Sequence, residues 1–172
     1  MRGVPKLFRE LEGDGVKLRP LSEDDLEKTR HWRNLQRIRK WFRDSSRVTP
    51  EQHADFWKVY CERNSAQTDF TFVIYAQHLQ RIVGQVAICN YNRDLGIAEL
   101  VRCMIGDGEA VGCGVMKAAI ERLVKWCRDE LNLLRLHLFV KIDNSRAIGL
   151  YESLGFSECS RKEDGIYMEK LL

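Results

Sequence analysis

One succession of patterns constrains the fold of this chain more than any other: a strand, a glycine-bearing loop, an apolar helix and a second strand. The first strand pattern covers Ile97–Ile105, the helix pattern runs from about Gly112 to Asp129, and the second strand covers Arg135–Lys141. A strand that leads through a helix into another strand favours a parallel crossover in one sheet. The chain is therefore expected to belong to the mixed α/β class.

The remaining patterns place helices early in the chain and strands late. Before the crossover we expect a short strand, two helices, a third helix capped by Thr49, and an antiparallel hairpin. Their expected ranges are Val16–Pro20, Glu23–Asn34, Leu35–Phe42, a helix start at Pro50, Asp69–Tyr75 and Arg81–Cys89. After the crossover we expect a helix and a closing hairpin, at Asn144–Leu154, Phe156–Arg161 and Gly165–Glu169. The whole chain, residues 1–172, is interpreted as a single domain.

Composition excludes several classes of protein. At 172 residues the chain has the size of one compact domain, and its formal net charge of +3 is too small to indicate a nucleic-acid binder. No apolar run reaches the roughly 18 residues that a membrane-spanning helix needs. The six cysteines include no Cys-x-x-Cys pair, so they are expected to be free. We therefore expect a cytoplasmic protein without nucleic-acid or membrane partners, either a monomer or a homodimer.

The loop before the crossover helix has the features of an anion site. Unpaired amide N–H groups at a helix start point outward, and the helix dipole adds positive potential there. Gly112 and Gly114 allow a diphosphate to approach the backbone closely. A simple turn with two glycines explains the pattern equally well, so the loop alone does not identify a ligand.

Two motifs together resemble the GNAT superfamily of acetyltransferases. The first is Glu109-Ala-Val-Gly-Cys-Gly114, which matches the family pattern Gln/Arg-x-x-Gly-x-Gly/Ala except at its leading Glu109. The second is Asn144-x-x-Ala-x-x-Leu-Tyr-x-x-Leu-Gly-Phe156. Together with Ala98-Glu-Leu100, they look most like the branch of ribosomal-protein and amino-sugar acetyltransferases. The resemblance runs from about Val16 to the C-terminus.

This resemblance implies a fold, a donor and a reaction. The fold is the GNAT fold, a central twisted mixed sheet of about six to seven strands flanked by helices. The reaction is direct transfer of acetyl from acetyl-CoA to an amine, without a metal. The residues that the resemblance assigns to the cofactor, the first three of them through their backbone, are Arg102, Cys103, Met104, Glu109, Ala110, Val111, Gly112, Cys113, Gly114 and Asn144.

Glu109 departs from the family pattern in a way that bears on cofactor affinity. The usual Gln or Arg places no negative charge beside a diphosphate, whereas Glu109 does. We expect its carboxylate to point to solvent while its backbone keeps the shape of the loop. On the sequence alone, the substitution Glu109→Gln is predicted to tighten cofactor binding.

Tyr151 and Glu99 are the candidate catalytic residues. The resemblance implies that Tyr151 gives a proton to the leaving thiolate, and a phenol suits this role because its pKa, near 10, is close to that of a thiol. Glu99 lies on a half-buried strand and is the leading candidate for the base that deprotonates the amine. The alternatives are a purely packed Tyr151 and a Glu99 paired with a neighbouring arginine. His137 and His31 are the fallback bases.

Residues that choose the acceptor are expected in the early helices. The run from His31 to Phe42 resembles acetyltransferases that modify an amino group on a nucleotide-activated deoxy-sugar. Arg33 and Arg37 suit phosphates, and Trp32 or Trp41 suits a base or sugar face, unless these aromatic residues only seat the helix on the sheet. We therefore expect a small-molecule primary amine as substrate, with an amino-sugar nucleotide as the best single candidate. A protein N-terminus is the second candidate, and a non-catalytic acyl-CoA-binding sensor is the candidate from another class.

Overall fold

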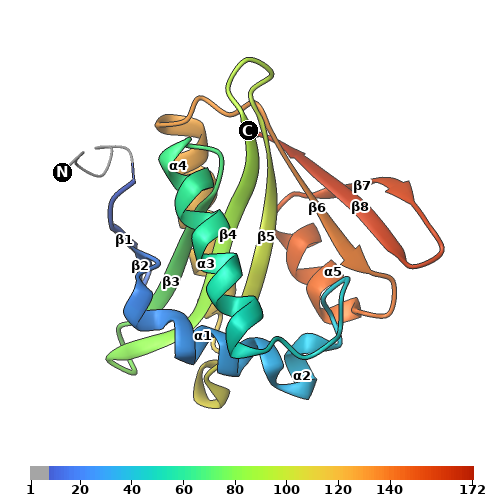
Figure 1. The fold of residues 1–172 in the computed structure, drawn as a ribbon. Helices are drawn as coiled ribbons and strands as arrows, with labels where there is room; N and C mark the ends of the chain where they lie inside the picture. Colours follow the sequence, from blue (N-terminus) through green and yellow to red (C-terminus); the bar gives the residue numbers. More distant parts are fainter. Residues whose placement is uncertain (1–7) are drawn as a thin grey trace.

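The computed structural model describes residues 8–172, which form one twisted eight-stranded sheet with helices around it (Figure 1). The strands lie in the order β1-β2-β3-β4-β5-β6-β8-β7. Their bounds are β1 Leu11–Gly13, β2 Val16–Pro20, β3 Phe70–Ala76, β4 Arg81–Asn92, β5 Ile97–Ile105, β6 Arg135–Lys141, β7 Ser157–Arg161 and β8 Gly165–Leu171. Every neighbouring pair is antiparallel except β5 and β6. The mixed α/β class and the parallel crossover expected from the sequence are confirmed, although the sheet has eight strands rather than six to seven.

Helices cover both faces of this sheet. Their bounds are α1 Leu26–Asn34, α2 Gln36–Arg39, α3 Pro50–Ser65, α4 Val115–Asp129 and α5 Ser145–Ser153. On β3, Phe72 and Ile74 join the core that α4 covers, whereas Val73 between them joins the cluster under α3. Because successive side chains of a strand point to opposite faces, α3 and α4 lie on opposite sides of the sheet. Figure 1 shows α3, in teal, in front of the strands and α4 behind them.

Capping signals set the start of two helices where the sequence predicts them. Thr49 Oγ1 accepts a hydrogen bond from the Gln52 amide at 3.2 Å, and the Gln52 side chain accepts one from the Thr49 amide at 2.9 Å. This reciprocal capping box opens α3. Asn144 opens α5 in a similar way, since its Oδ1 accepts from the Ala147 amide at 3.2 Å.

The start of α4 lies later than the sequence pattern indicates. Its first helical residue is Val115 rather than Gly112, because Gly112 and Gly114 have φ angles of 86° and 75°. Residues in this left-handed region cannot continue a right-handed helix. The two glycines therefore belong to an open loop at the N-terminal end of α4, and not to the helix itself.

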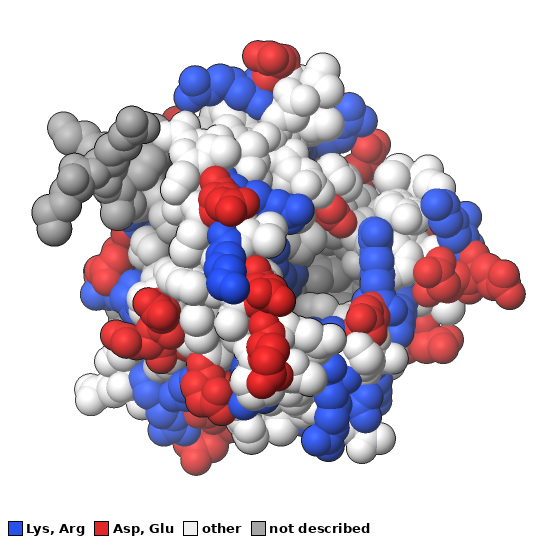
Figure 2. Space-filling view, viewed as in Figure 1, with Lys and Arg blue, Asp and Glu red and all other residues white. Residues whose placement is uncertain are grey.

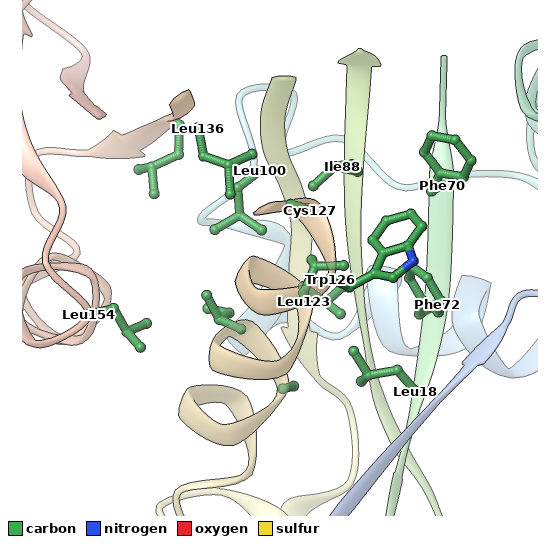
Figure 3. Close-up of a cluster of buried hydrophobic side chains, with 14 of the residues drawn as sticks. Leu18, Phe70, Phe72, Ile88, Leu100, Leu123, Trp126, Cys127, Leu136 and Leu154 are labelled. Atoms are coloured by element: carbon green, nitrogen blue, oxygen red, sulfur yellow. The ribbon is translucent and has the colours of Figure 1, made fainter. Parts of the chain in front are cut away.

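Trp126 of α4 anchors the main core (Figure 3). Its ring meets those of Phe70 and Phe72 on β3 edge-on, at centroid distances of 5.3 and 5.5 Å. Leu123 and Cys127 on the same helix are fully buried. Because burial of each large apolar side chain contributes about 1.5–3 kcal/mol, this packing fixes α4, and the loop at its start, relative to the sheet.

The two parallel strands separate soon after they begin to pair. Pairing joins only residues 97–99 of β5 to residues 135–137 of β6. Beyond these pairs β5 continues to Ile105 and β6 continues to Lys141, and Figure 1 shows the two strands diverging. Among residues 8–172, residues 100–105 of β5 therefore have no partner strand on their β6 side.

Three further observations concern residues 8–172. The six cysteines are free; Cys113 and Cys159 are exposed and the others are partly or fully buried. Within residues 8–172, no helix is both long enough and apolar enough to cross a membrane. No cluster of three or more His, Cys, Asp or Glu side chains suitable for a metal ion occurs in the same part of the chain.

Candidate active site

A cavity of about 750 Å³ occupies the space between the diverging strands. Its walls come from β5, β6, the first turns of α4 and α5, and residues 33–44 around α2. Figure 2 shows a hollow on this face of the molecule, with charged side chains of both signs around it. The divergence of β5 from β6 thus brings segments that are far apart in the sequence to one site.

Arg102 and Cys103 form a β-bulge within β5. In the register with β4 these two residues lie opposite the single residue Val86. Arg102 also has a φ angle of 55°, in the left-handed region. A bulge of this kind bends a strand and redirects its backbone groups. The bulge lies in the part of β5 that has no partner strand on its β6 side, and Met104 follows it along the same cavity wall.

The side chain of Arg102 anchors this bulge to residues at the start of β3, across β4. Its guanidinium donates to both carboxylate oxygens of Asp69 at 2.8 Å and to Thr71 Oγ1 at 3.0 Å. Asp69 is fully buried, and the guanidinium also lies 5.1 Å from the ring centre of Phe56 on α3. The charged end of Arg102 is therefore committed to the protein, which leaves the backbone as the part of this segment that suits a ligand.

The loop before α4 leaves open space of the kind that a diphosphate needs. A Cβ atom added at Gly114 would meet no atom within 4 Å, and one at Gly112 would meet only Arg146 Nη2, at 3.9 Å. Asn144, the cap of α5, also lines the cavity near this loop. A helix N-terminus, absent Cβ atoms and a nearby cation fit the diphosphate end of acetyl-CoA.

Sequence reasoning missed two basic residues beside this loop. Lys117 in the first turn of α4 and Arg146 in the first turn of α5 both line the cavity and are exposed. Neither forms an ion pair with any residue between 8 and 172. A cation in the first turn opposes the helix dipole, so its presence in both helices was the available signal for an anionic ligand.

Glu109 and Cys113, both expected among the cofactor-binding residues, do not line the cavity. The Glu109 carboxylate is 72% exposed and pairs with Arg81 at 2.7 Å, while Arg81 also binds Asp107 at 2.7 Å. The Cys113 thiol is exposed and donates to the Glu109 carbonyl at 3.3 Å. The other loop residues of the expected set do line the cavity: Ala110, Val111, Gly112 and Gly114. As expected, the carboxylate of Glu109 points away from the site.

Tyr151 extends from α5 into the wall of the cavity. It is 8% exposed and packs edge-on against Phe156 with ring centres 5.9 Å apart. Burial raises the pKa of its phenol well above the ordinary value, and the adjacent Cys103 thiol raises it further. The hydroxyl therefore carries its proton throughout the neutral pH range. Burial also raises the pKa of the Cys103 thiol to about 12, so this thiol is not a ready nucleophile.

Glu99 lies on β5 just before the strands separate. Its side chain is 18% exposed and lines the cavity. Asn90 Nδ2 donates to one carboxylate oxygen at 3.2 Å, and Arg43 lies 3.7 Å from the other. The fallback bases His31 and His137 do not line the cavity. Glu99 is thus both an arginine-paired strand residue and a carboxylate that faces the site.

Trp32 is a core residue, which corrects its expected role in substrate binding. Its side chain is 4% exposed, packs with Ile38 and Met104, and does not line the cavity. A Cβ atom added to Gly106 would come within 2.0 Å of its ring, so the contact with this part of the loop is tight. An aromatic residue on an amphipathic helix can face either the core or the cavity, and the sequence pattern did not decide between these two orientations. Trp41, the alternative aromatic residue, does line the cavity.

Arg33 and Arg37 both line the cavity, but each donates hydrogen bonds to backbone carbonyls of the protein. Arg37 donates to the carbonyls of Ile105 and Gly106, the first at 3.0 Å. Arg33 donates to the carbonyl of Asp44 through Nη2. Nη1 of Arg33 is buried and has no hydrogen-bond partner among the described residues. Arg37 is thus largely a structural clamp at the end of β5, whereas Arg33 keeps an unused donor.

Comparison with known proteins identifies the class. The family described as acetyltransferase (GNAT) domain matches residues 16–157, which is most of the chain. The chain therefore belongs to the GNAT acetyltransferases. For this domain, membership confirms the family that the sequence resembles, the acyltransferase class and acetyl-CoA as the donor.

Individual relatives are similar over nearly the whole chain. Spermidine N-acetyltransferase from Vibrio cholerae, solved with CoA and spermine, is 24% identical with a TM-score of 0.79, and 92% of this chain and 96% of that one are covered. Ribosomal-protein-S5-alanine acetyltransferase from Vibrio fischeri is 21% identical with a TM-score of 0.79, covering 94% and 96% of the two chains. These likenesses show the fold.

A curated relative adds information about length. An uncharacterized protein of Methanocaldococcus jannaschii is 25% identical over 162 residues, which cover 91% of this chain. The alignment covers 31% of that relative, so the chain spans about a third of its length.

Proposed function

We propose that this domain transfers an acetyl group from acetyl-CoA to the primary amine of a small molecule that carries an anionic group, with an amino-sugar nucleotide as the leading acceptor. The observation that carries the proposal is the single cavity, which contains the anion-binding loop, the buried phenol of Tyr151 and the carboxylate of Glu99. When bound, acetyl-CoA supplies an activated thioester for the amine to attack. The residues around it bind, orient and move protons.

Each residue of the proposed machinery has a separate role. The backbone of residues 110–114, with Lys117 and Arg146, binds the diphosphate. Backbone groups of Arg102–Met104 bind the pantetheine arm as an added strand would, because this edge of β5 has no partner strand. An amide N–H at the bulge supplies a hydrogen bond to the developing oxyanion without a side chain.

Two side chains handle the protons. Glu99 receives the ammonium form of the acceptor and removes the proton that blocks the nitrogen lone pair. Tyr151 lines the same cavity and, like any phenol, holds its proton at neutral pH, so it can give that proton to the sulfur leaving group as the thiolate develops. The two residues reach the cavity from different elements, β5 and α5, which matches opposite ends of one transfer.

The charge of the acceptor end favours an anionic amine over a polyamine. Among the side chains that line this end, the cations are Arg33, Arg37 and Arg43, and the anions are Asp44 and Glu99. A polyamine needs several carboxylates, whereas a nucleotide sugar combines one amine with a diphosphate. The ring of Trp41 offers a face for a base or a sugar.

A thiol-release assay with acetyl-CoA tests the proposal against amino-sugar nucleotides, peptides with free N-termini, and polyamines. We expect the highest kcat/KM with an amino-sugar nucleotide. A preference for peptides would instead assign a protein N-terminal acetyltransferase, and a preference for polyamines would contradict the charge argument. Tight acetyl-CoA binding without turnover on any amine would indicate a sensor and overturn the proposal.

A further inference from the structure

We propose that Arg43 is the residue that selects the acceptor, by binding its phosphate or carboxylate while Glu99 receives its amine. This inference rests on the proposed function. It narrows the substrate to amines whose anionic group is only a short distance from the nitrogen. Arg43 was not among the candidate residues from the sequence, and it belongs to the segment that follows α2.

Arg43 lines the cavity close to residues of β5, β6 and β8. Its guanidinium lies 4.3 Å from the ring centre of Phe139 on β6 and 5.6 Å from that of Tyr167 on β8. These two rings are themselves in contact, with centres 5.3 Å apart. On the β5 side the guanidinium lies 3.7 Å from Glu99. The two aromatic rings thus hold the arginine head beside the proposed base.

The donors of Arg43 are free in a way that those of its neighbours are not. Arg33 and Arg37 each donate to backbone carbonyls. Arg102 donates to the carboxylate of Asp69. Among residues 8–172, Arg43 has no hydrogen bond closer than its 3.7 Å ion pair with Glu99, and its side chain is 55% exposed. A guanidinium has five N–H donors in a fork that matches phosphate or carboxylate. A stacked head also loses less freedom when it binds.

The geometry limits the size of the acceptor. An amine bound to Glu99 and an anion bound to Arg43 are each about 3 Å from their protein partner. Since Arg43 Nη2 and Glu99 Oε1 are 3.7 Å apart, an acceptor bound through these two atoms has its amine and its anion at most about 10 Å apart. An amino sugar with a phosphate on its ring satisfies this limit, whereas a neutral amine leaves Arg43 without a ligand.

The test compares two probes that differ only in the anionic group, glucosamine and glucosamine 1-phosphate, in wild-type protein and in two variants. In the wild type we expect kcat/KM to be about tenfold to a hundredfold higher for the phosphate, the range of a charge-assisted hydrogen-bonded pair. In Arg43→Gln the ratio of the two kcat/KM values should fall close to one. The ratio cancels any effect of the substitution on Glu99 that both probes share. Arg47→Gln is the matched control, because Arg47 is an exposed arginine on the same segment that does not line the cavity, and it should keep the wild-type ratio.

Binding provides a second readout that does not depend on turnover. The Kd of glucosamine 1-phosphate for the CoA-loaded protein, measured by calorimetry, should rise at least tenfold in Arg43→Gln and stay unchanged in Arg47→Gln. Equal binding by wild type and Arg43→Gln, or a wild-type ratio near one, would overturn the inference about Arg43 while leaving acetyl transfer intact. If no amine releases thiol, the proposed function fails, and the calorimetric comparison alone decides the role of Arg43.

Discussion

The two walls of the cavity are built on different principles. The proposed donor wall, defined as residues 100–117 and 144–151, is shaped mainly by backbone, with left-handed residues at Arg102, Gly112 and Gly114. The acceptor wall, defined as residues 33–44, is shaped by long side chains on a short helix and the segment after it. In the proposed function, the backbone of one wall binds the donor that the family shares, whereas side chains of the other wall select the acceptor.

Tyr151 is the exception on the donor side, a side chain with a proposed chemical role, and its removal should have the largest effect. In Tyr151→Phe we expect kcat to fall by about a hundredfold or more, the usual contribution of a positioned proton donor. The Kd for CoA should not change, because the ring and its packing on Phe156 remain. Stopped-assay kinetics and calorimetry measure the two quantities. If Tyr151→Phe keeps the full kcat, Tyr151 is a packing residue, and only backbone groups of the donor wall take part in the transfer.

Asp69 tests whether the bulge depends on its buried ion pair. Asp69→Asn leaves the guanidinium of Arg102 without a charged partner, and removal of one member of a buried pair costs about 3 kcal/mol. We expect the free energy of unfolding in urea to fall by this amount and kcat to fall with it. Thr71→Val removes only the 3.0 Å hydrogen bond to Arg102 and should cost about 1 kcal/mol. Equal stability of Asp69→Asn and wild type would show that the bulge holds without the pair.

Gly114 and Gly15 form a matched pair for the backbone of the donor wall. Their φ angles are 75° and 78°, and an added Cβ meets no atom within 4 Å at either position. The alanine variants should therefore lose similar stability, about 1 kcal/mol each. Only Gly114→Ala should weaken acetyl-CoA binding, by about tenfold, because its methyl group occupies the approach of the diphosphate. Calorimetry with both variants separates strain from contact, and equal affinities would remove the loop from the proposed cofactor site.

Glu109 should give the smallest effect, which reverses the expectation from the sequence. Its carboxylate is 72% exposed and pairs with Arg81, which also pairs with Asp107. Exposed ion pairs contribute little, so Glu109→Gln should change the Kd for acetyl-CoA by less than about twofold. A clear tightening in the same calorimetric titration would mean that the charge of Glu109 acts on the diphosphate after all.

The contrast between the walls also explains what the sequence could predict. Periodicity, caps and the crossover pattern predicted most of the sheet and the starts of α3 and α5, because these features are local. Most of the residues expected to bind the cofactor line one cavity together with Glu99 and Tyr151. The sequence could identify them because the spacing of the glycines and of the residues on α5 is visible in the motifs. The side of α1 that faces the core is decided by tertiary packing, so the role expected for Trp32 was wrong. Arg43 was missed for the same reason, since its neighbours Phe139 and Tyr167 come from strands far away in the sequence.

The separation of β5 from β6 ties the stability of the chain to the supply of its donor. An unpaired strand edge can pair with a strand of another polypeptide. Here the unpaired edge of β5 lies inside the molecule beside a cavity. A metabolite that fills this edge binds only the folded chain, so at a hundred times its Kd it adds about 2.7 kcal/mol to the free energy of unfolding. The population of unfolded chain exposed to proteases should therefore fall when the acyl-CoA pool of the cell rises, and rise when that pool falls.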